Sequence, residues 1–170
     1  MKKVVLIFAS LLVIVAVSNT AKAQSTPSVA TATASAQIIQ PLVITKVADL
    51  AFGNIAAGTT LGTVVIDTDG NRMGDGGITL ITAGSVSNAA NFSITGYPEA
   101  TFTIELPTSI LISSDDNQMT VDNFVSSLGE TSSLDAMGES MLNVGATLNV
   151  EANQAPGLYE GTFDVTVAYN

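Results

Sequence analysis

The chain has 170 residues, with 15 Asp and Glu against five Lys and Arg, and it contains neither His nor Cys. The missing His and Cys exclude a serine–histidine triad, a histidine general base, a thiol nucleophile and a thiolate zinc site. Because there is no Trp and aromatic residues make up only 5%, the core has to be built from β-branched and Leu side chains, which favours strands over helices.

The first 23 residues have the features of a secretory signal peptide. Lys2 and Lys3 form a positive start, residues 4–17 are an apolar run, and Ala21-Lys22-Ala23 is a small-x-small cleavage site. The run is shorter than the about 20 apolar residues of a membrane span. We expect cleavage after Ala23, which leaves a single exported domain of residues 24–170 without a membrane span, in the periplasm, on the cell surface or outside the cell. The alternative is an uncleaved N-terminal anchor.

Removal of that segment makes the protein strongly acidic. Lys46 and Arg72 are the basic residues after position 23, whereas all 15 acidic residues follow it, so the net charge becomes −13. Two cations cannot form the basic surface that nucleic acids require, and anionic membrane surfaces repel so acidic a protein. We therefore expect no nucleic acid as a partner and attribute the acidity to solubility outside the cell.

The N-terminal part of the mature chain predicts extended structure. Apolar and hydroxyl residues alternate from Val29 to Ala36 and lead into residues 38–44, which predicts one long segment interrupted at Pro41. A short strand is expected over residues 50–55. Asp69-Gly70 then predicts a hairpin turn between strands at residues 62–66 and 78–82.

The remaining elements are short and also have strand character. Alternating stretches follow at residues 92–95 and 102–106, apolar stretches follow at 110–112 and 119–125, and residues 129–138 are rich in loop-forming side chains. The clearest strands are 142–150 and 163–169, where large apolar residues recur with a period of two. About nine short strands without a helical stripe predict an all-β fold, an antiparallel immunoglobulin-like sandwich.

The acidic turn after residue 66 is the candidate metal site. Oxygen-bearing side chains at alternate positions are typical of calcium loops, and here they would be Asp67, Asp69, Asn71 and Asp75. Arg72 stands where such a loop has Gly, and Ile78 stands where it has its closing carboxylate. A hairpin turn whose carboxylates bond local N–H groups is the alternative. Calcium is the only cofactor that the sequence suggests, and no other cofactor is expected.

The alternating segments near both ends suggest contacts between chains. An exposed strand edge can pair with another chain, and exported β-modules use such edges for β-strand addition. The alternative is that both ends pair within their own sandwich.

A series of motifs occurs in a recognisable order: Pro41-Leu42-x-Ile44-Thr45, Leu50-x-Phe52-Gly53-x-Ile55, Gly76-Gly77-Ile78-Thr79-Leu80, Phe92–Gly96, Thr101–Pro107, Val144-Gly145-Ala146-x-Leu148 and Ala155–Asn170. Together they resemble the bacterial family called domain of unknown function 4402, which has no assigned activity. The resemblance covers nearly the whole mature chain.

The C-terminal stretch is similar to that of chaperone–usher pilus subunits, which end on an alternating strand with a penultimate Tyr and an upstream Gly. This resemblance implies that a periplasmic chaperone first holds the last strand and that the N-terminal extension of a neighbouring subunit later completes the groove beside it. The implied groove residues are Gly157, Phe163, Val165, Val167 and Tyr169, and the implied donor segment contains Val29, Ala30, Ala32, Ala34 and Ala36. The lack of a disulfide and the small donor side chains depart from that pattern.

From these features we expect an exported structural or surface subunit, similar to a fimbrial or pilus subunit. It would make β-strand contacts with copies of itself or with another exported β-subunit, and no enzymatic activity is expected. The alternative is a monomeric secreted binding module whose acidic loops hold a metal or a glycan.

Overall fold

The computed structural model describes residues 26–170, so the expected cleavage after Ala23 lies outside the described part. Two units are distinguished, one ending at Ala36 and the other covering Gln37–Asn170, and each is described by itself. In the first unit, residues 26–36 belong to no strand and all of them are exposed. The second unit contains all the regular structure of the described residues.

Ten strands make up the second unit, and every pairing between them is antiparallel. They are β1 (Val43–Ala48), β2 (Asn54–Ile66), β3 (Arg72–Ile81), β4 (Ala90–Thr95), β5 (Thr101–Glu105), β6 (Ser109–Ser114), β7 (Asn117–Ser126), β8 (Thr131–Ser133), β9 (Glu139–Val150) and β10 (Thr166–Tyr169). Residues 26–170 contain no helix, which confirms the all-β prediction. In this part of the chain, accordingly, no helix is of a length and hydropathy that would span a membrane.

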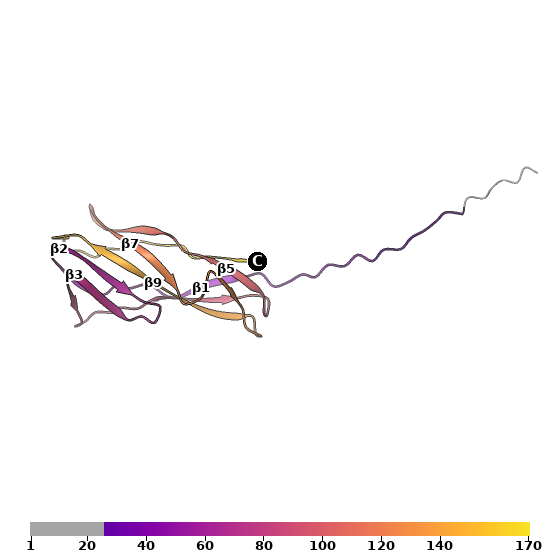
Figure 1. Cartoon of the computed structure of the whole chain (residues 1–170), viewed down its shortest axis with the longest axis horizontal. Coiled ribbons are helices and arrows are strands. Elements are labelled where there is room, and N and C mark those ends of the chain that lie inside the picture. Colours follow the sequence, from indigo (N-terminus) through magenta and orange to yellow (C-terminus); the bar gives the residue numbers. More distant parts are fainter. Residues whose placement is uncertain (1–25) are drawn as a thin grey trace, which may run out of the picture. The chain divides into compact units, whose positions relative to one another are not determined.

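The strands form two sheets that pack as a sandwich. The larger sheet follows the order β1-β4-β9-β2-β3, and β7 adds to β9 and carries β6, whereas the smaller sheet has the order β10-β5-β8. Figure 1 shows β2, β3 and β7 toward one end of this unit and β1 and β5 toward the other, with β9 between them. The antiparallel sandwich that the strand spacing predicts is therefore confirmed.

Buried apolar side chains form two clusters, of which one lies between the two sheets. One joins Phe102 and Ile104 of the smaller sheet to Ile94, Leu142 and Val144 of the larger sheet. The other is centred on Val64, Val121 and Leu148 in the half of the larger sheet formed by β2, β7 and β9. The period of two in β9 places successive apolar residues on one face, which is why this strand contributes to both clusters.

Several predicted elements differ from the observed strands; β2 and β3, for example, are longer than the strands expected at residues 62–66 and 78–82. The long segment expected from Val29 begins only at Val43, because Pro41 has no N–H to donate and the side chains before it are mostly too small to bury much apolar surface. The strand expected over residues 50–55 is mostly irregular, with β2 starting at Asn54. The loop expected at residues 129–138 contains β8, which is only three residues long.

Candidate functional site

The C-terminal segment, residues 160–169, pairs with the rest of the chain along one edge only. At its start, the N–H of Glu160 donates to the carbonyl oxygen of Ser113 at 3.0 Å, and the N–H of Ser113 donates back at 2.9 Å. At its end, Thr166 and Ala168 lie opposite Glu105 and Thr103 of β5. Between these pairings, residues 161–165 belong to no strand, so the predicted strand 163–169 is hydrogen-bonded only over β10.

The spacing of these pairings leaves a free edge. The N–H of Asn170 donates to the carbonyl oxygen of Thr101 at 3.2 Å, and hydrogen-bonded pairs alternate along an antiparallel ladder, so Ala168 and Thr166 are the bonded residues of β10. Glu160, Thr166 and Ala168 are all even-numbered, and main-chain groups of successive residues in an extended chain point to opposite edges. The N–H and C=O groups of Gly161, Phe163, Val165 and Val167 therefore point to the other edge. Among residues 26–170, no strand lies along that edge, since β10 is the terminal strand of its sheet. We call this the free edge.

The side chains of the same segment are nevertheless anchored in the core. Phe163, Val165, Val167 and Tyr169 are half-buried and pack against the first apolar cluster, whereas the residues between them are exposed. The Phe163 ring meets the ring of Phe92 edge-on at 6.4 Å between centroids and the ring of Phe124 at 5.1 Å. The period of two thus places these side chains inward as expected, and it holds the free edge in an extended conformation.

A hollow separates the unpaired part of the segment from the end of β5. It has a volume of about 320 Å³ and is lined by Glu105, Leu106, Pro107, Ile110, Thr162, Phe163, Asp164 and Thr166. The ladder stops here because β5 ends at Glu105 and the chain then turns away toward β6 through Pro107, which has no N–H to continue the pairing.

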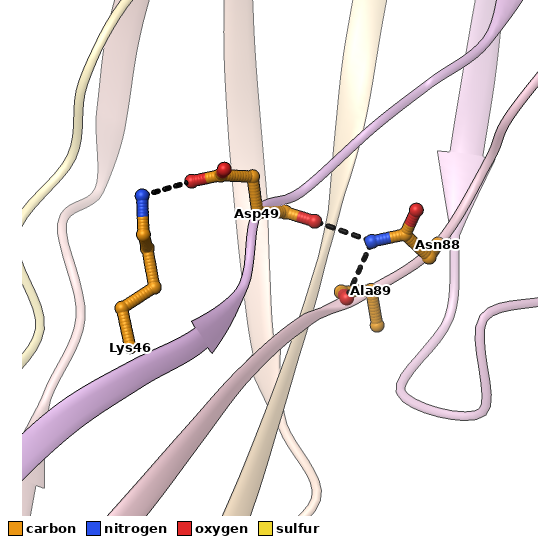
Figure 2. Close-up of polar contacts among 4 residues, drawn as sticks. All are labelled: Lys46, Asp49, Asn88 and Ala89. Atoms are coloured by element: carbon orange, nitrogen blue, oxygen red, sulfur yellow. Dashed lines mark hydrogen bonds and ion pairs between the residues drawn. The ribbon is translucent and has the colours of Figure 1, made fainter.

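Three other edge strands, β1, β3 and β8, carry features that discourage pairing with another chain. The edge strand β1 carries Lys46 and has a bulge between Lys46 and Ala48. Figure 2 shows Lys46 paired with Asp49 at 2.6 Å just beyond β1, while the Asn88 amide donates to the carbonyl oxygens of Asp49 and Ala89. The edge strand β3 is charged at Arg72 and Asp75, and β8 is short. The segment 160–169 has no Pro, Lys or Arg, and its charged residues are Glu160 and Asp164.

Tyr169 ties the end of this segment to two distant parts of the domain. Its hydroxyl group donates to the carbonyl oxygen of Gln40 at 2.9 Å and accepts from the N–H of Tyr97 at 2.6 Å. Gly96 lies so close to this hydroxyl that a Cβ there would meet it at 2.3 Å. The penultimate Tyr therefore positions β10 through both its ring and its hydroxyl.

Tyr169→Phe is expected to lower the free energy of unfolding by about 1–2 kcal/mol, because it removes two hydrogen bonds and leaves the Tyr97 N–H without its partner. Urea denaturation measures the difference. Tyr159→Phe, which alters a hydroxyl bonded to Ala155 and Gln154 near the other end of the C-terminal segment, serves as a comparison that leaves the contacts of β10 intact. Unchanged stability in Tyr169→Phe would contradict this role for the hydroxyl.

The other residues implied by the pilin resemblance lie elsewhere. Gly157 is in the loop before the free edge, against Ser114 at the end of β6, and is not one of the residues that point main-chain groups to the free edge. The donor residues Val29, Ala30, Ala32, Ala34 and Ala36 are in the part of the chain that forms no strand, and all of them are exposed.

The acidic turn is organised around Asp67. Its carboxylate accepts bonds from the N–H of Asp69 at 2.9 Å and from the N–H and side-chain amide of Asn71, both at 2.8 Å. Asp75 lies opposite Thr63, three ladder positions beyond the pair of Ile66 and Arg72 that closes the turn. Within the described residues, no group of three or more His, Cys, Asp or Glu is arranged to hold a metal ion. Asp67 and Asn71 therefore contact each other within the turn, whereas Asp75 lies farther along β3.

The hydrogen bonds from the Asn71 side chain, and then from the Asn71, Asp69 and Gly70 backbone, lower the pKa of Asp67 below its ordinary value of 3.8. A carboxylate with a lowered pKa stabilises the folded state above the unfolded pKa, and the contribution is lost as the pH falls through the folded pKa. Asp67→Asn should therefore lower the melting temperature at pH 7. The difference in melting temperature between the variant and the unsubstituted protein should narrow below about pH 4. A difference that stays constant or widens on acidification would contradict this.

Sequence reasoning did not identify three residues of the free-edge region. Glu160 pairs with Ser113, Gly161 packs against Ile112, and Gln40 receives the Tyr169 hydroxyl. Each contact joins residues that are far apart in the chain, and local periodicity carries no signal for such pairings. The Gly161 position leaves no room for a side chain, because a Cβ would come within 2.8 Å of the Ile112 side chain.

Comparison with known proteins agrees with the order of motifs in the chain. A search of curated proteins finds no match. The sequence model of one family matches residues 42–169, from the residue before β1 to the end of β10, and the donor residues lie outside that match. Because the match covers most of the chain, the protein belongs to the family described as Domain of unknown function (DUF4402).

Proposed function

We propose that this protein is an exported structural subunit, similar to a fimbrial or pilus subunit, that makes β-strand contacts with copies of itself or with another exported β-subunit. The observation that carries the proposal is the free edge, which presents the main-chain groups of Gly161, Phe163, Val165 and Val167 beside side chains that are anchored in the core. An extended strand with unpaired N–H and C=O groups is a template for a further strand.

The composition of the N-terminal part supports the proposal. Residues 26–36 are exposed and belong to no strand, and no acidic residue precedes Asp49. In a mature chain with a charge of −13, contacts between copies are opposed by repulsion, and a segment without carboxylates avoids that cost at the point of contact. The chain therefore offers both an acceptor edge and a segment that is compatible with it.

Export is part of the proposal and rests on the sequence of the first 23 residues. The positive start, the apolar run and the Ala-x-Ala site predict that the exported protein begins at Gln24. The intact mass of the protein recovered from the periplasm or medium of an expressing cell tests this. A mass that includes the apolar run would show an uncleaved anchor.

The proposed partner during export is a periplasmic chaperone that covers the free edge before assembly. An uncovered edge of this kind is exposed to non-specific pairing. We propose no catalytic activity, since the sequence has no His or Cys to serve as a general base or a thiol nucleophile.

The test is gel electrophoresis of the purified exported protein without and with heating, together with sedimentation velocity. A ladder of species that collapses to one band on boiling is the expected result, because strand addition buries main-chain bonds that resist detergent until the subunit unfolds. A single monomer in both measurements, over a range of protein concentrations, would contradict the proposal and favour a monomeric binding module.

A further inference from the structure

We infer that a hollow on the outer face of the larger sheet binds a short oligosaccharide that carries no acidic group. The hollow has a volume of about 470 Å³ and is lined by residues of β2, β3, β7 and β9, where β9 ends at Val150. We call it the outer hollow. Binding there does not depend on assembly, because the outer hollow belongs to the larger sheet and the free edge belongs to the smaller one.

Four polar side chains that line the outer hollow form one row across four strands. Thr63 of β2 lies opposite Asp75 of β3 on one side and opposite Asn149 of β9 on the other. Asn149 in turn lies opposite Thr120 of β7. The row faces away from the core, because the residues next to it in β2, β7 and β9 are buried in the second apolar cluster. Neighbouring strands are about 4.8 Å apart, so two side chains of the row can bond to adjacent hydroxyl groups of one sugar ring.

An irregular stretch of β2 forms one rim of the outer hollow. The pairing of β2 with β3 is interrupted between Ala57 and Gly62. Residues 58–61 there face the single residue Gly77, and such a bulge redirects the side chains around it. Leu61, the last residue of the bulge, is 63% exposed and lines the outer hollow. It provides an apolar surface for the C–H groups of a sugar ring.

The polar side chains of the outer hollow keep much of their bonding capacity for a ligand. The Asn149 amide donates to the carbonyl oxygen of Thr120 at 3.4 Å, which is longer than the about 2.7–3.2 Å of an ordinary N–H···O bond. Asp122, which also lines the outer hollow, accepts from Asn123 at 3.0 Å through Oδ1 alone. Hydroxyl, amide and carboxylate groups together offer both donors and acceptors. This set matches a ligand that is rich in hydroxyl groups.

The charge of the outer hollow selects against acidic ligands. Asp75, Asp122 and Glu151 line it, whereas Lys46 and Arg72, the basic residues after position 23, bond to groups elsewhere. A uronic acid or a phosphate group would therefore meet three carboxylates with no cation beside them. Among residues 26–170, these carboxylates are not grouped so that they could hold a metal ion. A neutral sugar or an amino sugar is the ligand that fits both the charge and the hydrogen-bonding groups.

Saturation-transfer difference NMR of the purified exported protein tests this inference, because it detects weak ligands of monomers and assemblies alike. The probes are lactose, the disaccharides of glucosamine and of N-acetylglucosamine, and digalacturonate. We expect at least one of the first three to bind with a dissociation constant roughly in the millimolar range, since the site is open and the contacts are few. Digalacturonate should not bind. Binding of the glucosamine disaccharide alone identifies an amino sugar as the ligand, and binding of the uncharged disaccharides identifies a neutral one.

Substitutions within the row test the position of the site. Thr63→Val and Asn149→Ala each remove one hydrogen-bonding group and should weaken binding about three- to tenfold. Thr147→Val is the matched control for Thr63→Val, because Thr147 lies on the same outer face, opposite Val65 of β2, but does not line the outer hollow. It should leave binding unchanged. The melting temperature of each variant verifies that it is folded.

Three results would overturn the inference: no binding of any of the first three disaccharides at roughly tens of millimolar, equally tight binding of digalacturonate, or equal losses in Thr63→Val and Thr147→Val. None of these results bears on strand addition, which the gel and sedimentation measurements test separately. Failure of strand addition would likewise leave the sugar-binding site standing.

Discussion

Replacing Phe102 by alanine is expected to lower the free energy of unfolding by about 3–5 kcal/mol. Phe102 is fully buried in β5, opposite Tyr169 of β10, and belongs to the cluster that joins the two sheets. Its removal leaves a cavity directly beneath the C-terminal segment, and the surrounding side chains can fill that space only in part. Urea denaturation followed by circular dichroism measures the change.

Thr101→Ala is the matched control for Phe102→Ala. Thr101 is the preceding residue of β5, and its side chain is exposed on the other face of the sheet. The substitution should alter the free energy of unfolding by no more than about 0.5 kcal/mol. Equal losses in the two variants would mean that β5 does not present Phe102 to the core, and the assignment of the smaller sheet would then be wrong.

Val165→Asp is expected to cost about 2–4 kcal/mol and to prevent assembly. The Val165 side chain is half-buried against the first apolar cluster, so the new carboxylate would lie among apolar groups with no cation beside it. The segment that forms the free edge would detach from the core in part of the molecules. Melting temperature and the unheated gel ladder report the two effects separately.

Thr166→Asp tests whether the loss of stability in Val165→Asp depends on the buried face of the strand or on the place of the substitution in the chain. Thr166 is exposed, but it lies opposite Glu105, so the added charge should cost about 0.2–1 kcal/mol through repulsion between like charges. If Thr166→Asp proves more destabilising than Val165→Asp, the inward and outward faces of the C-terminal segment are reversed in our description.

The strongly periodic strands could be predicted from the sequence, and their inward faces with them. Leu142–Val150 lies within β9, and the inward set Phe163, Val165, Val167 and Tyr169 packs on the core as the alternation indicates. Periodicity of this kind depends only on which face of a strand is buried, so it can be recognised in the sequence before the partner strands are known. The Asp-Gly hairpin between β2 and β3 was predictable for a similar reason, because its turn chemistry is local.

The extent of hydrogen bonding could not be predicted in the same way. Phe163 and Val165 alternate as regularly as Val167, yet they lie outside β10, because β5 ends at Glu105 and the chain then leaves the sheet. The three polar residues of β8 show no apolar alternation, and they form a strand only because β5 lies beside them. Whether a strand has a neighbour is a property of the whole fold, and the free edge of the candidate site depends on that property.

The candidate metal residues show the limit of a spacing argument. Asp67, Asp69 and Asn71 alternate like calcium ligands, but the Asp67 carboxylate is used to bond the N–H groups of its own turn. The hairpin then carries Asp75 away along β3. These residues therefore form a hydrogen-bonded turn, and the sequence pattern alone does not distinguish such a turn from a calcium loop.

The most direct test of the free edge is amide hydrogen exchange, read residue by residue in the monomer isolated by gel filtration and in the assembled protein. We predict that the amides of Thr166 and Ala168, which bond to β5, are protected in both states. The amides of Phe163, Val165 and Val167 should exchange rapidly in the monomer and become protected on assembly. Protection of these three amides in the monomer, equal to that of Thr166 and Ala168, would show that the edge is already paired and would contradict the account.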